Sequence, residues 1–160
     1  GKGDEVITTP YTYAATANVI MLQGAKPVFV DIENESYNID PLKIEEKITS
    51  KTKAIMPIHY GGQSAEMGKI TKIAQDNGLL VFEDAAPAAG ATFQNKKVGG
   101  IGDVGAFSFF PDKNMTTGEG GMLTTNSDEI AEKAQILKRN GAKGRYNHIE
   151  IGWNFKSRRY

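Results

Sequence analysis

The stretch VGAFSFFPDKNMTTGEGG, residues 104–121, decides how this chain is interpreted. It opens with an apolar and aromatic run typical of a β-strand, and the alternation of such a strand places Ala106 and Ser108 on one face. Lys113 follows five residues after Ser108 and precedes a glycine-rich turn, residues 118–121. A lysine held between a strand end and such a turn is partly immobilised, and its amine can act as a nucleophile toward an aldehyde. An isolated lysine is more often a solvated surface group, so Lys113 alone does not define a function.

A second segment supplies the context for this lysine. Residues 79–84, LLVFED, form a continuous apolar run that ends in two carboxylates, Glu83 and Asp84. Such a run predicts a central strand buried on both faces, and open α/β sheets bind their ligands at the carboxyl ends of their strands. The small residues 85–90 leave room there for something flat. Alone, this segment favours a helix cap or an ion pair for the carboxylates. Together with Lys113, it predicts a ligand site.

The rest of the sequence alternates short β-rich runs with helical patterns. This pattern predicts one α/β domain with a mostly parallel central sheet flanked by helices. Caps, prolines and glycines mark the expected helix ends. The expected strands are 5–8, 27–30, 53–58, 79–83, 104–109 and 122–125, and the expected helices are 14–23, 42–48, 65–76 and 128–138, with Ser64 as the cap of the third helix.

The composition narrows the class of protein. The chain has 160 residues, of which 39% are hydrophobic and 24% charged, as in an ordinary globular domain. Nineteen basic residues balance nineteen acidic ones, so we expect no general attraction to nucleic acid or to an anionic membrane. Cysteine is absent, which excludes disulfides and thiolate metal sites. No apolar run approaches the ~20 residues of a membrane span, and no secretory signal opens the sequence, so we expect a cytoplasmic domain.

One glycine motif matches a nucleotide-binding fingerprint only as a string. Gly100-x-Gly102-x-x-Gly105 has the spacing of the dinucleotide-binding loop, which must follow a strand and open a helix. Here the motif follows the polar residues 95–97 and runs into the expected strand at 104–109. We therefore expect no dinucleotide site at these glycines.

Neither histidine has metal-ligand spacing. His59 and His148 lie far apart in the sequence, with no further metal ligands at suitable distances along the chain. His59 follows a run that reads as a buried strand, where its ring can bond the backbone. We expect His59 to be a structural residue.

With these segments combined, the sequence resembles the DegT-type sugar aminotransferases, which belong to the aspartate aminotransferase superfamily of pyridoxal-phosphate enzymes, fold type I. The resemblance runs through Asn154 and implies the large domain of that fold, without its first strand and without the C-terminal small domain. The matching motifs are EDAA at 83–86, GA at 90–91, GD at 102–103 and FSFxxxKxxxxGEGG at 107–121, together with GDEVIT at 3–8, AATAN at 14–18 and GAKPVFVD at 24–31.

The resemblance implies roles for five residues. Lys113 would bind pyridoxal 5'-phosphate as a Schiff base and then carry the proton between substrate and cofactor carbons. Asp84 would pair with the pyridinium nitrogen of the cofactor, and Ser108 would bond its phosphate. Tyr13 would stack on the pyridine ring. Asn154 would reach the phosphate of the neighbouring subunit, which implies a homodimer with a shared site.

The sequence departs from the family pattern at three positions. Pro87 stands where many members carry a glutamine that bonds the phenolic oxygen of the cofactor, and proline has no donor to offer. Lys156 and Ser157 stand where an arginine and a methionine are expected. We expect residues 1–155 to form a partial cofactor-binding large domain, residues 156–160 to form an unstructured tail, and the chain to be a piece of a longer protein.

The activity implied by the resemblance is the transfer of an amino group, usually from glutamate, onto a nucleotide-linked keto-sugar. Lysine at position 113 argues against the dehydratase branch of the family, in which histidine typically replaces it. Two alternatives stay open. The first is a catalytically inactive remnant that folds or self-associates, because a shared site with one side absent rarely positions both substrates. The second is a lyase of the same fold type that acts on amino acids, against which the turn at 118–121 argues.

Overall fold

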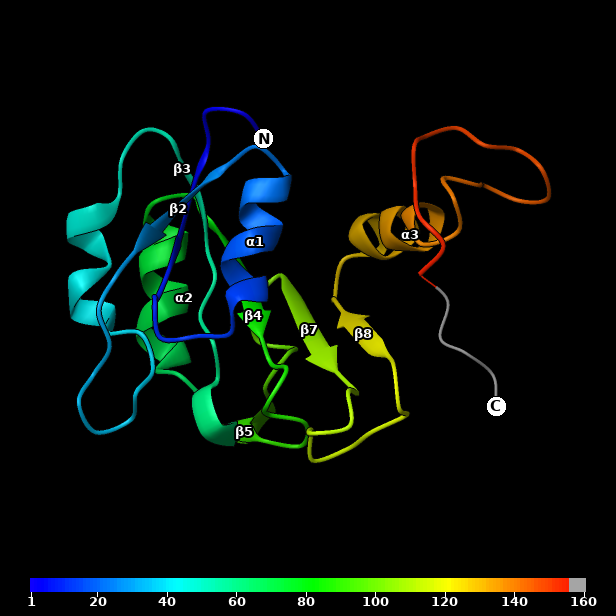
Figure 1. Ribbon diagram of the computed structural model, residues 1–160. Helices are drawn as coiled ribbons and strands as arrows, with labels where there is room; N and C mark the ends of the chain where they lie inside the picture. The colour runs from blue at the N-terminus through cyan, green and yellow to red at the C-terminus, as the bar shows by residue number, and fades with distance from the viewer. Residues whose placement is uncertain (156–160) are drawn as a thin grey trace.

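The computed structural model describes residues 1–155 and has an α/β architecture built on a six-stranded sheet (Figure 1). The strand order is β2-β1-β3-β4-β7-β8, with β8 antiparallel at one edge and all other pairs parallel. The strands of this sheet are β1 (Glu5–Thr8), β2 (Lys26–Phe29), β3 (Thr52–Ile55), β4 (Leu80–Asp84), β7 (Val104–Ser108) and β8 (Gly121–Thr124). A separate hairpin pairs β5 (Thr92–Phe93) with β6 (Lys96–Lys97).

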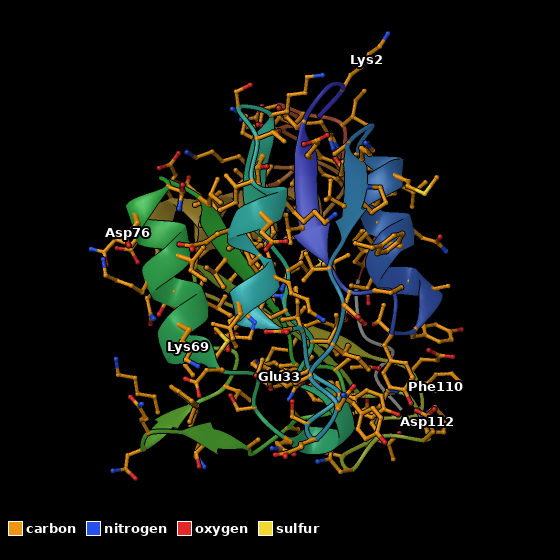
Figure 2. All side chains as sticks on the ribbon, turned by 90° about the vertical axis from the view of Figure 1, so that its left-hand side faces the viewer. Lys2, Glu33, Lys69, Asp76, Phe110 and Asp112 are labelled. Atoms are coloured by element: carbon orange, nitrogen blue, oxygen red, sulfur yellow. The ribbon has the colours of Figure 1, made fainter. Side chains whose placement is uncertain are left out.

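Helices cover both faces of this sheet. The helices are α1 (Ala14–Leu22), α2 (Met67–Asp76) and α3 (Asp128–Leu137), with three short 3-10 segments, η1 (Pro41–Lys43), η2 (Glu45–Lys47) and η3 (Tyr60–Gly62). Val6 of β1 packs with Ile20 of α1, whereas the next residue, Ile7, packs with Ile70 of α2. Because successive strand residues point to opposite faces, α1 and α2 lie on opposite sides of the sheet. Figure 2 shows this arrangement, with α1 in blue and α2 in green on either side of the strands.

The predicted fold class and all six predicted strands are confirmed, although β3 ends at Ile55 rather than at residue 58. The expectation that residues 79–84 are buried on both faces is wrong. Val81 and Glu83 are buried, but Leu80 on the other face is 45% exposed. On that face, Phe82 packs against the cluster of Val6, Ile20 and Ala54, whereas Leu80 belongs to none of the described core clusters.

Three of the four predicted helices are confirmed, and the one at 42–48 is wrong. Asp40 does cap this segment, since its Oδ1 accepts from the backbone N–H of Leu42 at 2.9 Å. The chain then forms only η1 and η2, because so short a segment gains too few hydrogen bonds to form a stable α-helix. The predicted cap Ser64 is also wrong: its hydroxyl donates to the carbonyl of Ala65, and the Ala65 N–H is bonded to His59. Helix α2 therefore begins only at Met67.

The hairpin of β5 and β6 was not predicted. Its strands are two residues long and show no alternation of polar and apolar residues. The turn between them is formed by Gln94 and Asn95, both with positive φ (48° and 65°), which is the backbone of a tight hairpin turn. Phe93 packs against the core cluster that includes α2. Lys96–Lys97 is thus a strand in front of the glycine motif at 100–105, but this motif still leads into β7 and not into a helix.

No helix within residues 1–155 combines the length and the apolar composition needed to cross a membrane. The predicted tail, residues 156–160, lies outside the described residues, as do the departures from the family pattern at Lys156 and Ser157. The division into domains expected from the sequence therefore stays a prediction.

Candidate active site

Asp84 is the last residue of β4 and lies at the carboxyl end of the sheet. Its Oδ2 accepts from the hydroxyl of Thr16 at 2.8 Å, and its Oδ1 accepts from the backbone N–H of Ala86 at 3.1 Å. Thr16 is buried in the first turn of α1, and its hydroxyl also lies 2.9 Å from that of Thr12. Because the Thr16 hydroxyl donates to Asp84, Thr12 is the donor to Thr16. The Asp84 carboxylate is thus fixed in direction yet only partly buried, which leaves lone pairs free for a ligand.

Ser108 ends the neighbouring strand, β7, at the same edge of the sheet. Asp84 is paired with Ala106 in the parallel ladder of β4 and β7, and Ser108 lies two residues further along on the same face. The predicted alternation is confirmed, because Phe107 on the opposite face packs against the small core cluster around Val98. Ala106 is exposed although β7 is an inner strand of the sheet. Asp84 and Ser108 therefore flank an uncovered patch of sheet whose floor is the small side chain of Ala106.

Lys113 lies in the loop between β7 and β8, and its side chain is 27% exposed. Its Nζ lies 3.1 Å from the carboxylate of the exposed Asp112, and its backbone N–H donates to the carbonyl of Phe110. The amide of Asn114 donates to the carbonyl of Ala89 at 3.1 Å, which ties this loop to the one that follows Asp84. In Figure 2, the labelled Phe110 and Asp112 lie at the end of the molecule opposite Lys2.

Tyr13 and Asn154 are placed differently from one another. Tyr13 is the N-cap residue of α1, three positions before Thr16, and its side chain is 84% exposed with no capping hydrogen bond. Tyr13 therefore lies at the N-terminal end of α1, the end at which Thr16 bonds Asp84. Asn154 is exposed and forms an isolated antiparallel backbone bridge with Arg139, just after α3. Its segment runs beside α3 and away from β4 (Figure 1).

The structure thus brings Asp84, Ser108 and the end of α1 to one edge of the sheet, with the Lys113 loop beside them. Among the hydrogen bonds and ion pairs of residues 1–155, none joins Lys113 to Asp84 or to Ser108. The donor set nevertheless suits pyridoxal phosphate. A carboxylate can pair with a protonated ring nitrogen, a hydroxyl can bond a phosphate, and an amine can react with an aldehyde, here around a patch whose floor is a single methyl group.

The environment of the second carboxylate, Glu83, could not be predicted from the sequence. Glu83 points to the opposite face from Asp84 and is 1% exposed. Its Oε1 accepts from the N–H groups of Ile101 (2.8 Å) and Gly102 (2.7 Å), and its Oε2 accepts from Gly99 (2.7 Å). The ring of His59 completes the set, with Nε2 at 2.9 Å from Oε2. The backbone of residues 99–102, which overlaps the glycine motif, therefore does bind an anion, but the anion is a side chain of the protein itself.

The structural role predicted for His59 is confirmed. Its ring is fully buried, and Nδ1 accepts from the backbone N–H of Ala65 at 3.1 Å. Since Nδ1 is an acceptor, Nε2 carries the proton and donates it to Glu83. Burial opposes ionisation of Glu83, but the hydrogen bonds from His59 and from the three backbone N–H groups outweigh it and lower the pKa of this carboxyl.

Gly105, the last glycine of the motif, is required for packing. A Cβ at this position would lie 2.3 Å from the carbonyl oxygen and 2.4 Å from the Cα of Gly99, closer than any real contact. A side chain here would push Gly99 away and pull its N–H from Glu83. Gly105 thus allows the close approach of two backbone stretches, β7 and the loop at Gly99.

Comparison with known proteins identifies the family of this chain. Residues 1–158 match the model of the DegT/DnrJ/EryC1/StrS aminotransferase family. An uncharacterised protein of Methanocaldococcus jannaschii is 61% identical over 138 residues (86% of this chain, 36% of that protein). The GDP-perosamine synthase of Caulobacter vibrioides is 48% identical over 158 residues (98% and 43%). The crystal structure of S. venezuelae DesV in complex with a ketimine intermediate superimposes with a TM-score of 0.92 at 38% identity, covering 96% of this chain and 42% of that one.

The chain spans 36–43% of the length of these relatives. Within that span, both the sequence and the fold agree with theirs, and the residues around Lys113, Asp84 and Ser108 carry the motif by which the sequence resembled sugar aminotransferases. The chain therefore belongs to the DegT/DnrJ/EryC1/StrS aminotransferase family.

Proposed function

We propose that this chain is the cofactor-binding part of a pyridoxal-phosphate aminotransferase that moves an amino group from glutamate onto a nucleotide-linked keto-sugar. The observation that carries the proposal is the convergence of Asp84, Ser108 and the Lys113 loop on one uncovered edge of the sheet. Named relatives support the substrate class. They include GDP-perosamine synthases and a UDP-2-acetamido-2-deoxy-3-oxo-D-glucuronate aminotransferase of Pseudomonas aeruginosa, which is 45% identical to this chain over 155 residues.

Each residue of the site has a defined task in this proposal. When bound, pyridoxal phosphate supplies an aldehyde that takes up the amino group and a ring that accepts electrons. Lys113 holds the cofactor through Nζ and, once released, carries a proton to and from the reacting carbon as general base and acid. Asp84, aimed by the Thr16 hydroxyl, holds the proton on the ring nitrogen. Ser108 donates its hydroxyl hydrogen to the phosphate.

Tyr13 and Asn154 complete the proposal. Tyr13, exposed at the end of α1, offers its ring for stacking on the cofactor. Asn154, exposed beside α3, would serve the site of a second subunit, so we propose a homodimer with shared sites. Pro87 supplies no donor for the phenolic oxygen of the cofactor, so this contact must come from another residue. We propose the cytoplasm as the location, on composition alone.

The competing proposal is a folded but inactive chain. It is favoured by one observation: among the contacts of residues 1–155, the Nζ of Lys113 pairs with Asp112 and not with the other members of the site. In that case the chain would bind the cofactor weakly or would only self-associate. A turnover measurement separates the two proposals.

The turnover test uses the purified chain with pyridoxal phosphate, glutamate and either GDP-linked or UDP-linked keto-sugars. We expect an amino-sugar nucleotide and an equal amount of 2-oxoglutarate, detected by mass spectrometry, because the amino group leaves glutamate as its carbon becomes a ketone. Omitting the keto-sugar is the control. A chain that binds the cofactor but forms no amino-sugar would support the inactive alternative, whereas ammonia and a keto acid from amino acids alone would support a lyase.

A further inference from the structure

Glu83 lies one residue before Asp84, yet its carboxylate faces the opposite side of the sheet and takes no part in the proposed reaction. We propose that Glu83 is a positioning residue for Asp84. By tying the end of β4 to the chain after β3 and to the loop before β7, it fixes the direction in which Asp84 presents its carboxylate. The inference rests on the proposed function for its catalytic meaning, and it can be tested without the cofactor.

The first tie runs to the chain after β3. His59 donates from Nε2 to Glu83 at 2.9 Å, and its backbone N–H donates to the carbonyl of Asp84 at 3.0 Å. The backbone N–H of Asp84 in turn donates to the carbonyl of Pro57 at 2.8 Å. One histidine therefore contacts both carboxylate-bearing residues, through its side chain on one and its backbone on the other. A shift of the His59 ring would move the peptide group of Asp84.

The second tie runs to the loop before β7. Three backbone N–H groups of this loop, those of Gly99, Ile101 and Gly102, converge on the Glu83 carboxylate within 2.8 Å. The chain then enters β7, whose Ala106 carbonyl accepts from the N–H of Ala85 at 2.9 Å. Because β7 also carries Ser108, this tie sets the spacing between the two strand ends that flank the proposed cofactor patch.

The carboxylate of Asp84 depends on this backbone for its direction. The Thr16 hydroxyl bonds Oδ2, and the N–H of Ala86, two residues on, bonds Oδ1, so this second bond is kept only if residues 84–86 keep their conformation. The amide of Ala86 is therefore a direct reporter on the Asp84 carboxylate. The amide of Ala85 reports on the contact between β4 and β7.

The substitution Glu83→Gln keeps the shape of the side chain and changes its hydrogen bonding. An amide oxygen can still accept from Ile101 and Gly102, but the amide NH2 then faces two donors, the N–H of Gly99 and Nε2–H of His59. His59 cannot change tautomer without turning a second N–H toward that of Ala65. The variant therefore loosens both ties while leaving Asp84 itself unchanged.

The matched control is Asp103→Asn. Asp103 is a carboxylate of the same loop, and its Oδ2 accepts from the N–H of Val81 at 2.8 Å, nearer the start of β4. This substitution changes a carboxylate that contacts β4, but at the start of the strand and away from Asp84. The amide of Val30 donates to the carbonyl of Thr8 between β2 and β1, at the edge of the sheet distant from β7. It reports on the stability of the sheet as a whole.

The experiment is amide hydrogen exchange by NMR on the whole cofactor-free chain and on each variant. In Glu83→Gln, we expect the amides of Ala85 and Ala86 to exchange about tenfold faster or more relative to that of Val30, because local opening at the end of β4 becomes easier. In Asp103→Asn, this ratio should stay at the value of the unsubstituted chain. Equal acceleration of all three amides in Glu83→Gln would mean that Glu83 only stabilises the fold and would overturn the proposal, as would unchanged rates.

A second variant keeps the test decisive if Glu83→Gln does not fold. His59→Asn removes the donor to Glu83 but keeps an acceptor for the Ala65 N–H, and Glu83 retains its three backbone donors. We expect a smaller selective acceleration at Ala86, and the absence of any would overturn the proposal. Failure of the unsubstituted chain to bind pyridoxal phosphate would instead count against the proposed function, and the exchange result would still decide the role of Glu83.

Discussion

Replacement of Lys113 with alanine is expected to abolish the visible absorbance band that forms when the chain binds pyridoxal phosphate. The same variant should lower amino transfer by at least about 10³-fold, because the covalent attachment and the general base are lost together. Thr16, Asp84 and Ser108 lie on other segments, so the rest of the site should be unaffected. Absorbance spectra at saturating cofactor and a turnover assay measure the two effects.

The control for this variant is Lys97→Ala. Lys97 is exposed and contacts the loop after β4, since its Nζ donates to the carbonyl of Gly90 at 3.2 Å. Lys97 belongs to β6 of the hairpin, which precedes the glycine motif in the sequence, whereas Lys113 follows β7. The loss of Lys97 should leave the band and the turnover unchanged. An unaltered band in Lys113→Ala would remove Lys113 from the site.

Replacement of Glu83 with alanine is expected to cost about 3–5 kcal/mol of folding free energy, as for other buried pairs that lose one partner. Three backbone N–H groups and Nε2–H of His59 would lose their acceptor in a region closed to water. Urea unfolding at neutral pH, followed by circular dichroism, measures the loss. Glu132→Ala, which removes an exposed ion pair with Lys143, is the control and should unfold at nearly the same urea concentration as the unsubstituted chain.

The contribution of Glu83 to the free energy of unfolding should depend on pH. Because hydrogen bonds lower the pKa of Glu83 in the folded chain, its contribution to stability is fully present above the ordinary pKa of a glutamate and is lost as the pH falls through the lowered value. The difference in unfolding free energy between the unsubstituted chain and Glu83→Ala should therefore shrink in acid. A difference that stayed constant from neutral to strongly acidic pH would contradict this account.

Much of the site could be predicted from the sequence because it depends on strand order and alternation. The apolar run at 79–84 and the run at 104–109 are strands by composition, and alternation alone puts Ala106 and Ser108 on one face. Ligand residues at the carboxyl ends of parallel strands then follow from the fold class. The structural role of His59 could also be predicted, because a buried ring that follows a strand needs hydrogen-bond partners in the backbone.

The remaining features depend on contacts that no local pattern records. Thr16 lies 68 residues before Asp84 and looks like any polar residue in the first turn of a helix. The donors around Glu83 could not be predicted, because a glycine string does not say which anion its N–H groups meet. Helix α2 begins two residues later than the pattern predicts, because the N–H of Ala65 bonds the ring of His59 in the preceding loop.

The most direct test of the proposed cofactor site is to identify which lysine binds pyridoxal phosphate in the unsubstituted chain. The chain is incubated with the cofactor, reduced with borohydride, digested and analysed by mass spectrometry. The proposal predicts a label carried almost entirely by Lys113, because only this lysine lies in the loop next to Asp84 and Ser108. A label spread over exposed lysines such as Lys97, or no label at all, would contradict it.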